Sequence, residues 1–156
     1  MKTISSNPKA YYDYHILDEF IAGIALKGHE VKSAKLGKVN IKGSYIKPWN
    51  RELLAIGMNI SKYMGQGEEE RVRTLLLNKK EIDQIIKKIE AKGMTIIPLK
   101  VLLVRGLIKV KIALAKGKKN YDKREAIMKK EQKREMNRFI KNKNRWIHYT
   151  TTLLRQ

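Results

Sequence analysis

Two apolar runs in the second half of the chain constrain its fold more than any other feature. Residues 94–104 (MTIIPLKVLLV) and 107–115 (LIKVKIALA) stand on either side of the dipeptide Arg105-Gly106. In the second run apolar residues alternate with lysines, in the order Ile108, Lys109, Val110, Lys111, Ile112, with Leu114 beyond. This period of two is typical of a strand with one buried face. The pattern predicts an antiparallel hairpin that turns at Arg105-Gly106, with one core face and one cationic face.

Three other segments have the composition of strands. Residues 14–26 mix apolar and polar positions around Gly23, which predicts a strand that bends or bulges. Residues 39–48 alternate at first and continue after Gly43 as a bent strand. Residues 51–63 predict one more strand after a turn.

Helical periodicity occurs in two places. Residues 28–37 fit one or two helical turns with a single apolar face. Residues 78–93 are the clearest helix, because Asn78 stands at the N-cap position, Glu81 completes a capping box and Gly93 follows the last turn. The apolar stripe of this helix consists of Ile82, Ile85, Ile86 and Ile89.

The order of these elements indicates the fold class. About six short strands with two helices, and no regular alternation of strand and helix, predict a mainly-β member of the α+β class. We expect an OB-like closed antiparallel barrel with flanking helices. A chain of 156 residues fits one domain of common size with a short appendage. The prediction places the barrel in residues 1–115 and a basic C-terminal tail in residues 116–156.

The chain carries far more positive charge than solubility requires. It has 35 Lys and Arg residues against 15 Asp and Glu residues, a net charge of +20 at pH 7. Residues 116–156 hold 14 of these cations and 4 of the anions, so the tail carries half of the net charge. Such a charge repels itself unless a polyanion is near, and a nucleic acid is the leading candidate.

The tail combines helix-forming residues with few apolar ones. Asp122 and Glu125 are spaced to cap a helix, and Glu125 pairs with Lys129 one turn later. The apolar residues are too sparse for a continuous stripe and consist of Ile127, Met128, Met136, Phe139 and Ile140. An isolated helix without a buried face is marginal, so we predict a tail that is disordered when free and helical against a partner. The alternative is a solvated surface helix or a solubility tail.

Two groups of side chains are candidates for contact with a nucleic acid. Lys109 and Lys111 share a strand face, and with Arg71 and Arg73 they predict a surface that follows phosphates. The aromatic side chains that offer stacking faces for bases are Tyr11, Tyr12, Tyr14, Tyr45 and Trp49. For any single one of these aromatics, burial in the core is the commoner role.

The sequence offers little support for catalysis. The histidines His15, His29 and His148 are far apart and have none of the spacings used by zinc sites. There is no P-loop and no GxSxG motif, and the acidic residues 68–70 belong to a glycine-rich segment typical of an exposed loop. We therefore expect a non-enzymatic protein without a cofactor or a metal site.

The sequence also bears on the compartment. It contains no cysteine, which fits a reducing cytosol. No stretch reaches about 18 consecutive apolar residues, and the N-terminal segment lacks the apolar region of a signal peptide. The tail has no broad apolar face for a membrane surface. We expect a cytoplasmic protein without a membrane partner.

Several segments, taken in order, resemble one known family. They are GHEVKSAKLGKVNIKGSY at residues 28–45, RVRTLLLNKKEI at residues 71–82 and IIPLKVLLVRGLIKVKIALAKGKKNYDKRE at residues 96–125. In this order they resemble the SmpB family, the small protein B of bacterial ribosome rescue. The resemblance runs from about Asn7 to Lys143, nearly the whole chain.

This resemblance implies both a fold and a function. The OB-like barrel would hold the transfer-RNA-like domain of transfer-messenger RNA (SsrA), and the protein would deliver this RNA to stalled ribosomes for trans-translation. The incomplete protein would then be tagged and released. The tail would form a helix in the vacant messenger channel, near the decoding centre of the small subunit. Elongation factor Tu would be an indirect partner through the charged RNA.

Positions that match the family's motifs imply two sets of site residues. The RNA-facing set would consist of Glu30, Lys32, Ser33, Gly37, Asn40, Arg71, Arg73, Leu76 and Asn78. The set that acts in the ribosome would consist of Gly117, Lys118, Lys119, Asp122, Lys123 and Arg124. The alternative roles are turn geometry for Gly37 and core packing for Leu76. An aspartate suits a helix cap beside cations better than a phosphate contact, so Asp122 is predicted to cap the tail helix.

Some positions depart from the family pattern. Tyr12, Ile21 and Thr74 stand where the family usually has histidine, glutamate and lysine, and residues 64–70 lack the usual basic character. Residues 146–156 match no pattern of the family. From the residues alone, a second class of function stays open. It is a structural ribosomal protein, or a general single-strand-binding OB-fold protein, whose tail threads ribosomal RNA.

Overall fold

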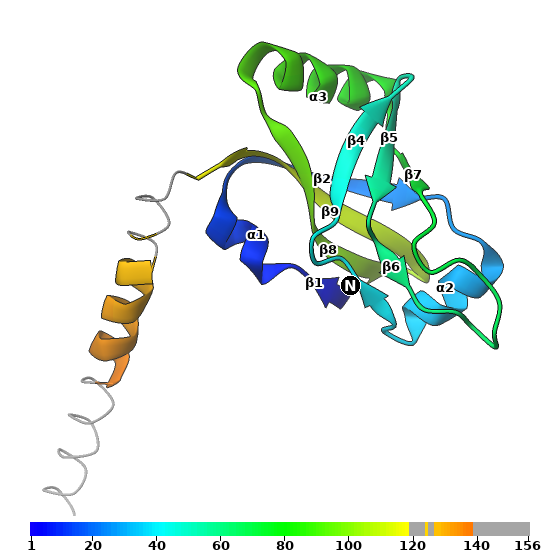
Figure 1. The fold of residues 1–156 in the computed structure, drawn as a ribbon, viewed down its shortest axis with the longest axis horizontal. Helices are drawn as coiled ribbons and strands as arrows, with labels where there is room; N and C mark the ends of the chain where they lie inside the picture. Colours follow the sequence, from blue (N-terminus) through cyan, green and yellow to red (C-terminus); the bar gives the residue numbers. More distant parts are fainter. Residues whose placement is uncertain (119–123, 125–126, 139–156) are drawn as a thin grey trace, which may run out of the picture. The chain divides into compact units, whose positions relative to one another are not determined.

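The computed structural model describes residues 1–118, 124 and 127–138. The chain divides into two units, residues 1–117 and residues 118–156 (Figure 1). The helices of the first unit are α1 (Pro8–Asp13), α2 (Gly28–Lys35) and α3 (Lys79–Lys92). Its strands are β1 (Lys2–Ser6), β2 (Tyr14–Ile24), β3 (Val39–Asn40), β4 (Tyr45–Trp49), β5 (Glu52–Ile56), β6 (Asn59–Ile60), β7 (Arg73–Leu76), β8 (Thr95–Val104) and β9 (Leu107–Gly117).

Seven of the strands in residues 1–117 form one antiparallel sheet whose pairings return to their start. The order of hydrogen-bonded neighbours is β1-β8-β4-β5-β7-β2-β9, and β9 also pairs with β8. The strands β8, β4, β5, β7, β2 and β9 therefore form a ring, and β1 pairs with β8 outside the ring. The return from β4 to β8 consists of the register pair Ile46 and Ile96. The predicted mainly-β architecture of the α+β class, with flanking helices, is confirmed.

The strands β8 and β9 form the predicted hairpin. Val104 pairs with Leu107, so Arg105 and Gly106 make a two-residue turn with φ angles of 50° and 78°. Positive φ at both positions is the turn geometry that matches the twist of the flanking strands. The apolar positions of β9 are buried on one face, as the alternation predicts.

The C-terminal end of β9 differs from the prediction. Ala113 and Ala115 are buried in a cluster with Ala10 of α1, so this part of the outer face is apolar and covered instead of cationic. The strand also continues to Gly117, which pairs with Tyr14 of β2. The barrel unit therefore ends at residue 117 and not at the predicted boundary.

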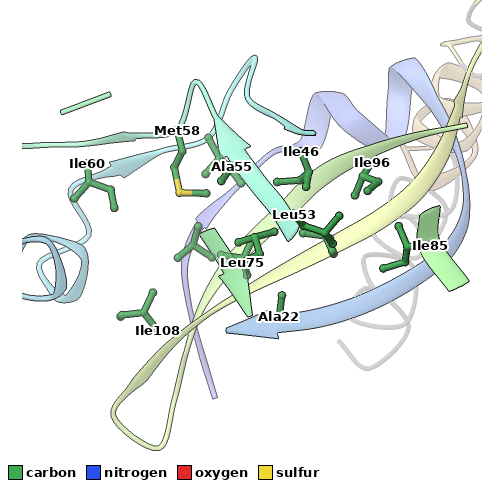
Figure 2. Packing of buried hydrophobic residues seen from close by; sticks show 14 of the residues in the cluster. Ala22, Ile46, Leu53, Ala55, Met58, Ile60, Leu75, Ile85, Ile96 and Ile108 are labelled. Carbon is green, nitrogen blue, oxygen red and sulfur yellow. The ribbon is translucent and has the colours of Figure 1, made fainter. Parts of the chain in front are cut away.

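Apolar side chains from the ring fill the interior of the barrel. Figure 2 shows Leu53, Leu75 and Ile96 in one cluster with Ile85 of α3. Each of these four side chains is at most 2% exposed. Burial of a side chain of this size contributes about 1.5 to 3 kcal/mol to stability. The apolar stripe therefore holds α3 against the barrel and fixes the direction of the chain on either side of it.

The helix α3 begins and ends where the sequence predicts. Ile82 and Ile85 are buried, and Gly93 follows the last turn in the left-handed conformation, with φ of 61°. Asn78 is the N-cap residue, but its side chain accepts no hydrogen bond from the backbone of the helix. Its Nδ2 donates to Oε1 of Glu81 at 3.2 Å. A contact between two side chains therefore replaces the predicted capping box.

Two elements at the N-terminus are absent from the prediction. The strand β1 has no alternating apolar pattern, and it is a strand because it pairs with an edge of β8. The helix α1 follows Asn7 and has Pro8 in its first turn, where the missing N–H of proline leaves no hydrogen bond unmade.

Three strands of the structure differ in their bounds or bulges from the predicted strands. Residues 39–48 form β3 and β4, because the chain turns at residues 42 and 43 between them. Residues 51–63 form β5 and β6, and β6 pairs with β3 in a separate two-stranded sheet.

In β2 the register shifts between Ile16 and Asp18 and not at Gly23. A Cβ at position 23 would lie 3.3 Å from the Cβ of Leu76, so Gly23 permits the close approach of β7. The bulge and the glycine are therefore separate features of this strand.

Residues 127–138 of the second unit form a helix, drawn in orange in Figure 1. Every side chain of these residues is exposed, including Ile127, Met128 and Met136. The helix therefore has no buried face, as the sparse apolar residues indicate. The predicted transition from disorder to helix on binding stays a prediction.

Candidate RNA interface

Glu30 is the centre of a buried group of charges. It lies in the first turn of α2 and is 2% exposed. Its Oε1 accepts hydrogen bonds from the backbone N–H of Lys27 at 2.9 Å and from Nη2 of Arg71 at 2.5 Å. Its Oε2 accepts a hydrogen bond from Nε of Arg73 at 2.6 Å. A buried carboxylate requires such donors, and here both oxygens have them.

Arg73, at the start of β7, is fully buried. Besides the bond to Glu30, its Nη1 donates to the carbonyl of Met58 at 2.7 Å. Its Nη2 donates to the carbonyls of Glu68 and Glu69, each at 3.2 Å. These bonds join β7 to α2 and to the loop that precedes β7. Arg73 therefore fixes the local fold, which corrects the prediction that it faces RNA.

The same bonds determine the charge state of Glu30. Burial alone would raise the pKa of this carboxyl above its usual value of 4.5. The hydrogen bonds from Arg71, from the N–H of Lys27 and from Arg73, together with the charge of Arg73, outweigh burial and lower the pKa to about 2. Glu30 is therefore ionised at neutral pH and holds both arginines in place.

Ser33 and Gly37 also serve the fold around α2. Ser33 is buried, and its Oγ donates to the carbonyl of Ser61 at 2.7 Å. Gly37 follows α2 with φ of 80°, and its N–H donates to the carbonyl of Ala34 at 2.9 Å. Gly37 therefore has the turn geometry of the alternative role, but it is also exposed, so its predicted contact with RNA stays a prediction. For Ser33, as for Glu30, burial corrects the prediction of a residue that faces RNA.

Polar and charged side chains of the predicted set reach the surface beside this buried group. Lys32 is exposed on α2, and its Nζ lies 5.5 Å from the centre of the Tyr63 ring, within the range of a cation-π contact. The side chain of Arg71 is 26% exposed. Asn40 is exposed, and its Oδ1 accepts a hydrogen bond from the N–H of Lys42 at 3.0 Å.

A hollow lies between α2 and the loop after β6. It is lined by Gly28, His29, Lys32, Tyr63, Met64 and Gln66. A Cβ at position 67 would lie 2.6 Å from Nε2 of His29, so Gly67 allows the loop to approach α2. The sequence prediction lacks this hollow. The glycines of residues 64–67 signal a loop, but they do not show which element the loop approaches.

A second hollow lies where β2, β7 and β9 meet the start of α3. It is lined by Ile21, Gly23, Leu76, Leu77, Asn78, Glu81 and Lys109. Leu76 is 56% exposed, so the alternative of core packing is wrong for this residue. Asn78 is exposed as well. The structure therefore brings Leu76, Asn78 and Lys109 into one surface region.

The predicted phosphate-following surface is only partly present. Lys111 lies on the same strand face as Lys109, but its Nζ is 2.9 Å from Oε2 of Glu19. The hydrogen bond and charge of Glu19 raise the pKa of Lys111. With Arg73 buried and Lys111 paired with Glu19, the remaining members of the predicted surface are Arg71, whose side chain is 26% exposed, and the half-buried Lys109.

Comparison with known proteins decides the family. The family model described as SmpB protein matches residues 4–142. The chain belongs to the SmpB family.

Related SmpB-family proteins match over nearly the whole chain. An SsrA-binding protein from Fusobacterium nucleatum is 49% identical over 146 residues, covering 91% of this chain and 99% of that protein. An SsrA-binding protein from Thermosipho africanus is 47% identical, covering 90% of this chain and 98% of that protein. A chain of a solved structure described as "tmRNA-SmpB: a journey to the center of the bacterial ribosome" is 40% identical, with a TM-score of 0.63. That match covers 79% of this chain and 93% of the other, and the resemblance found in the sequence is confirmed.

The three departures from the SmpB pattern lie on three different elements. Ile21 of β2 is 53% exposed in the second hollow, so an apolar side chain stands where the family usually has glutamate. Tyr12 of α1 and Thr74 of β7 are half-buried. Ile21 and Leu76 together give this SmpB-family chain an apolar patch at the edge of the candidate interface.

The aromatic side chains are more exposed than the sequence predicts. Tyr11, Tyr45 and Trp49 are 43%, 48% and 64% exposed, so the commoner core role is wrong for these three. Tyr12 and Tyr14 are half-buried. Tyr45 and Trp49 occupy outward positions of β4, where the alternation of the strand turns them away from the core.

The structure describes part of the tail set implied by the SmpB motifs. Gly117 ends β9, Lys118 follows it, and Arg124 is exposed in helical conformation. Three members lie outside the described residues, namely Lys119, Asp122 and Lys123. The predicted cap at Asp122 therefore stays a prediction.

Two further findings concern the part of the chain that the structure describes. Within it, no group of three or more His, Asp or Glu side chains could hold a metal ion. No helix among the described residues is both long and apolar enough to cross a membrane. The candidate interface thus consists of cations, amide groups, aromatic rings and small apolar patches.

Proposed function

We propose that this chain binds SsrA RNA, the transfer-messenger RNA, and acts with it on stalled ribosomes in trans-translation. The observation that carries the proposal is the match to SmpB over residues 4–142. Proteins that are 49% and 47% identical to it are SsrA-binding proteins. The related solved structure is described as one of tmRNA-SmpB and the bacterial ribosome.

The charge of the chain supports the same function. A net charge of +20 favours a polyanion as partner, and RNA phosphates supply the opposite charge. Charge alone gives affinity without selectivity, so selectivity has to come from shape and from hydrogen bonds to particular groups of the RNA.

The residues that contact the RNA lie around α2 and the start of α3. The contact set that we propose is Lys32, Gly37, Asn40, Arg71, Leu76 and Asn78. Lys32 and Arg71 supply charge, Asn40 and Asn78 supply amide groups, and Leu76 supplies an apolar surface. These types suit phosphates, sugar hydroxyls and the faces of bases respectively.

Glu30, Ser33 and Arg73 act beneath this surface. Their bonds hold α2, β7 and the loop before β7 in one arrangement. A surface that is already ordered loses less conformational freedom when it binds, which favours affinity. These three residues are therefore positioning residues and make no direct contact with RNA.

The tail is the second working part of the proposed mechanism. In it we assign contact with the small ribosomal subunit to Gly117, Lys118, Lys119, Asp122, Lys123 and Arg124. The helix of residues 127–138 has no buried face, so it gains contacts when the vacant messenger channel surrounds it with RNA. The protein works in the cytoplasm as a binding protein without catalysis. Elongation factor Tu joins indirectly, through the charged RNA.

The test is a comparison of affinities for two RNAs at about 0.15 M salt. The wild-type protein should bind the transfer-RNA-like domain of transfer-messenger RNA at least about tenfold more tightly than it binds bulk transfer RNA. Lys32→Gln and Asn78→Ala should weaken binding to the first RNA. Lys92→Gln, which removes a lysine from the far end of α3, is the matched control and should bind as the wild type does.

The alternative function predicts a different result in the same measurement. A structural ribosomal protein or a general single-strand-binding protein would bind both RNAs alike, and its affinity would fall steeply as salt is raised. Equal affinities would therefore contradict the proposed function.

A further inference from the structure

The β4–β5 hairpin has an outer face that the proposed contact set does not use. Tyr45, Lys47 and Trp49 are exposed along β4, while Ile46 between them is buried. Alternate residues of a strand lie on the same side of it. An aromatic ring, a cation and a second aromatic ring therefore follow one another along the surface.

Trp49 is the more exposed of the two aromatic rings. Tryptophan carries a large apolar area that proteins normally bury, yet this side chain is 64% exposed. Its cross-strand partner on β5 is Glu52, which offers a carboxylate instead of an apolar cover. Nζ of Lys47 lies 6.0 Å from the centre of the ring, at the limit of a cation-π contact. Most of the indole is therefore accessible to a ligand.

The turn that follows Trp49 contains an arginine where glycine is the usual residue. Trp49 pairs with Glu52, so Asn50 and Arg51 form a two-residue turn with φ angles of 49° and 60°. Asparagine tolerates positive φ, and glycine normally fills the next position because a side chain is strained there. Arg51 takes this position in spite of the strain. The hairpin thus carries a guanidinium group at its tip.

The hairpin tip lies against the start of α3 (Figure 1). Arg51 of the turn and Lys79, Ile82 and Asp83 of α3 line a hollow there. Lys79 directly follows Asn78, which belongs to the proposed contact set. The tip is therefore continuous with the proposed RNA interface.

We propose that Lys47, Trp49, Arg51 and Lys79, here named the hairpin platform, bind an unpaired nucleotide of the same RNA. The indole of Trp49 stacks on the base, and the cations contact the flanking phosphates. The RNA-facing set implied by the SmpB motifs contains none of these four residues. The inference rests on the proposed function only for the identity of the RNA.

The chemistry of the platform favours RNA over a protein partner. Every base has a flat face that stacks on an aromatic ring, and cations beside the ring neutralise the neighbouring phosphates. The buried centre of a protein interface is instead depleted of charged residues, whereas Lys47 and Glu52 stand beside this ring. Here Nζ of Lys47 lies 6.0 Å from the centre of the exposed ring, and Arg51 of the adjoining turn lines a hollow with Lys79 of α3.

Tryptophan fluorescence tests the stacking directly. The chain has two tryptophans, Trp49 and Trp146, so the full-length Trp146→Phe protein reports on Trp49 alone. Titration with the transfer-RNA-like domain of transfer-messenger RNA should quench this emission. The midpoint of the quenching curve should equal the midpoint of the binding curve. A blunt-ended RNA duplex, which has no unpaired nucleotide, should quench it much less at the same salt concentration.

Substitution of Trp49 tests its contribution to affinity. Trp49→Ala should raise Kd for the transfer-RNA-like domain about 5- to 100-fold, the range that base stacking on an aromatic ring supports. Trp49→Phe should keep most of the affinity, because a phenyl ring still stacks.

Arg51→Gly separates binding from folding. Glycine suits a positive φ, so Tm should stay or rise by about 1 to 4 °C. The slope of log Kd against log salt should become shallower by about 0.7 to 0.9, the value of one phosphate contact. The matched control is Arg105→Gly, because Arg105 also has a positive φ, 50°, in the turn of the β8–β9 hairpin. It removes the same charge from another turn and should leave the slope unchanged.

Three results would overturn the inference in distinguishable ways. Unchanged emission of Trp49, or equal affinity of the wild type and Trp49→Ala, would overturn the inference. The proposed function would stand in that case if the wild type still prefers transfer-messenger RNA. Quenching by isolated small ribosomal subunits, without quenching by the transfer-RNA-like domain, would assign the platform to another RNA and overturn it as well. A wild-type protein that binds both RNAs of the affinity test alike would contradict the proposed function, and the inference would fail with it.

Discussion

The barrel and the tail helix carry similar charged residues and use them in opposite ways. In the barrel Arg73 is fully buried, and it is bonded to Glu30 and to backbone carbonyls. In the helix of residues 127–138 every side chain, charged or apolar, is exposed. Buried and paired charges hold elements of the barrel together, whereas the exposed charges of the helix do not join it to another element.

This difference separates what each region can do alone. The barrel derives its structure from its own core and from the ion pairs around Glu30. A helix of about 12 residues without a buried face is marginal in water. The tail helix therefore depends on a partner for its stability, and its cations stay available for that partner.

The largest expected effect comes from removing the tail after Gly117. Tagging of incomplete proteins, measured in a translation assay with a message that lacks a stop codon, should be abolished. Affinity for the transfer-RNA-like domain at near-physiological salt should change by less than about tenfold, because the contact set lies in the barrel. If the truncated protein keeps its Tm but loses RNA binding, the tail belongs to the RNA interface and the division of roles is wrong.

The next effect concerns the buried ion pairs. Arg73→Met leaves the carboxylate of Glu30 buried without its deepest partner, and it should lower the free energy of unfolding by about 3 to 5 kcal/mol. Urea unfolding measures this change. The control is Arg134→Met in the tail helix, which should change the stability of the barrel by less than about 0.5 kcal/mol. A loss below about 1 kcal/mol for Arg73→Met would contradict the assigned structural role.

Acid should weaken the barrel through Glu30. Its pKa is lowered from 4.5 to about 2, so the unfolded chain binds this proton more readily than the folded chain does. The resulting stabilisation, on the order of 3 kcal/mol, is present above about pH 4.5 and is lost as the pH falls towards 2. Urea unfolding between pH 5 and 2.5 measures the slope. Glu30→Gln should be less stable at neutral pH and should lack this part of the slope.

The fold could be predicted where the spacing of apolar residues along a segment indicates which face is buried. In β9 and α3 the apolar residues recur with the period of the element, so both were predictable in type and in place. The strand β1 has the sequence KTISS, which carries no such repeat. Its conformation comes from pairing with β8, for example Ser5 with Val101, and no local pattern contains that contact.

For the candidate site, the sequence shows which segments carry charged residues but not how deeply each side chain is buried. Arg71 and Arg73 are the same residue type in one segment, yet the side chain of Arg71 is 26% exposed and that of Arg73 is buried. Glu30 and Arg73 are 43 residues apart, and only the fold brings them together as mutual partners. Residue type predicts a charge, whereas burial decides whether that charge holds the fold or meets a ligand.

The smallest effect concerns an exposed ion pair of the barrel. Nζ of Lys88 on α3 lies 3.1 Å from Oδ2 of Asp18 on β2, with side chains 45% and 44% exposed. Lys88→Gln should lower the free energy of unfolding by less than about 1 kcal/mol, and the difference should vanish at about 1 M salt, where exposed charges are screened. Lys87→Gln removes the same charge from the neighbouring position and serves as the control in urea unfolding. A loss above about 2 kcal/mol that persists at high salt would show that exposure does not decide what a charge contributes, and the contrast between the barrel and the tail helix would lose its physical basis.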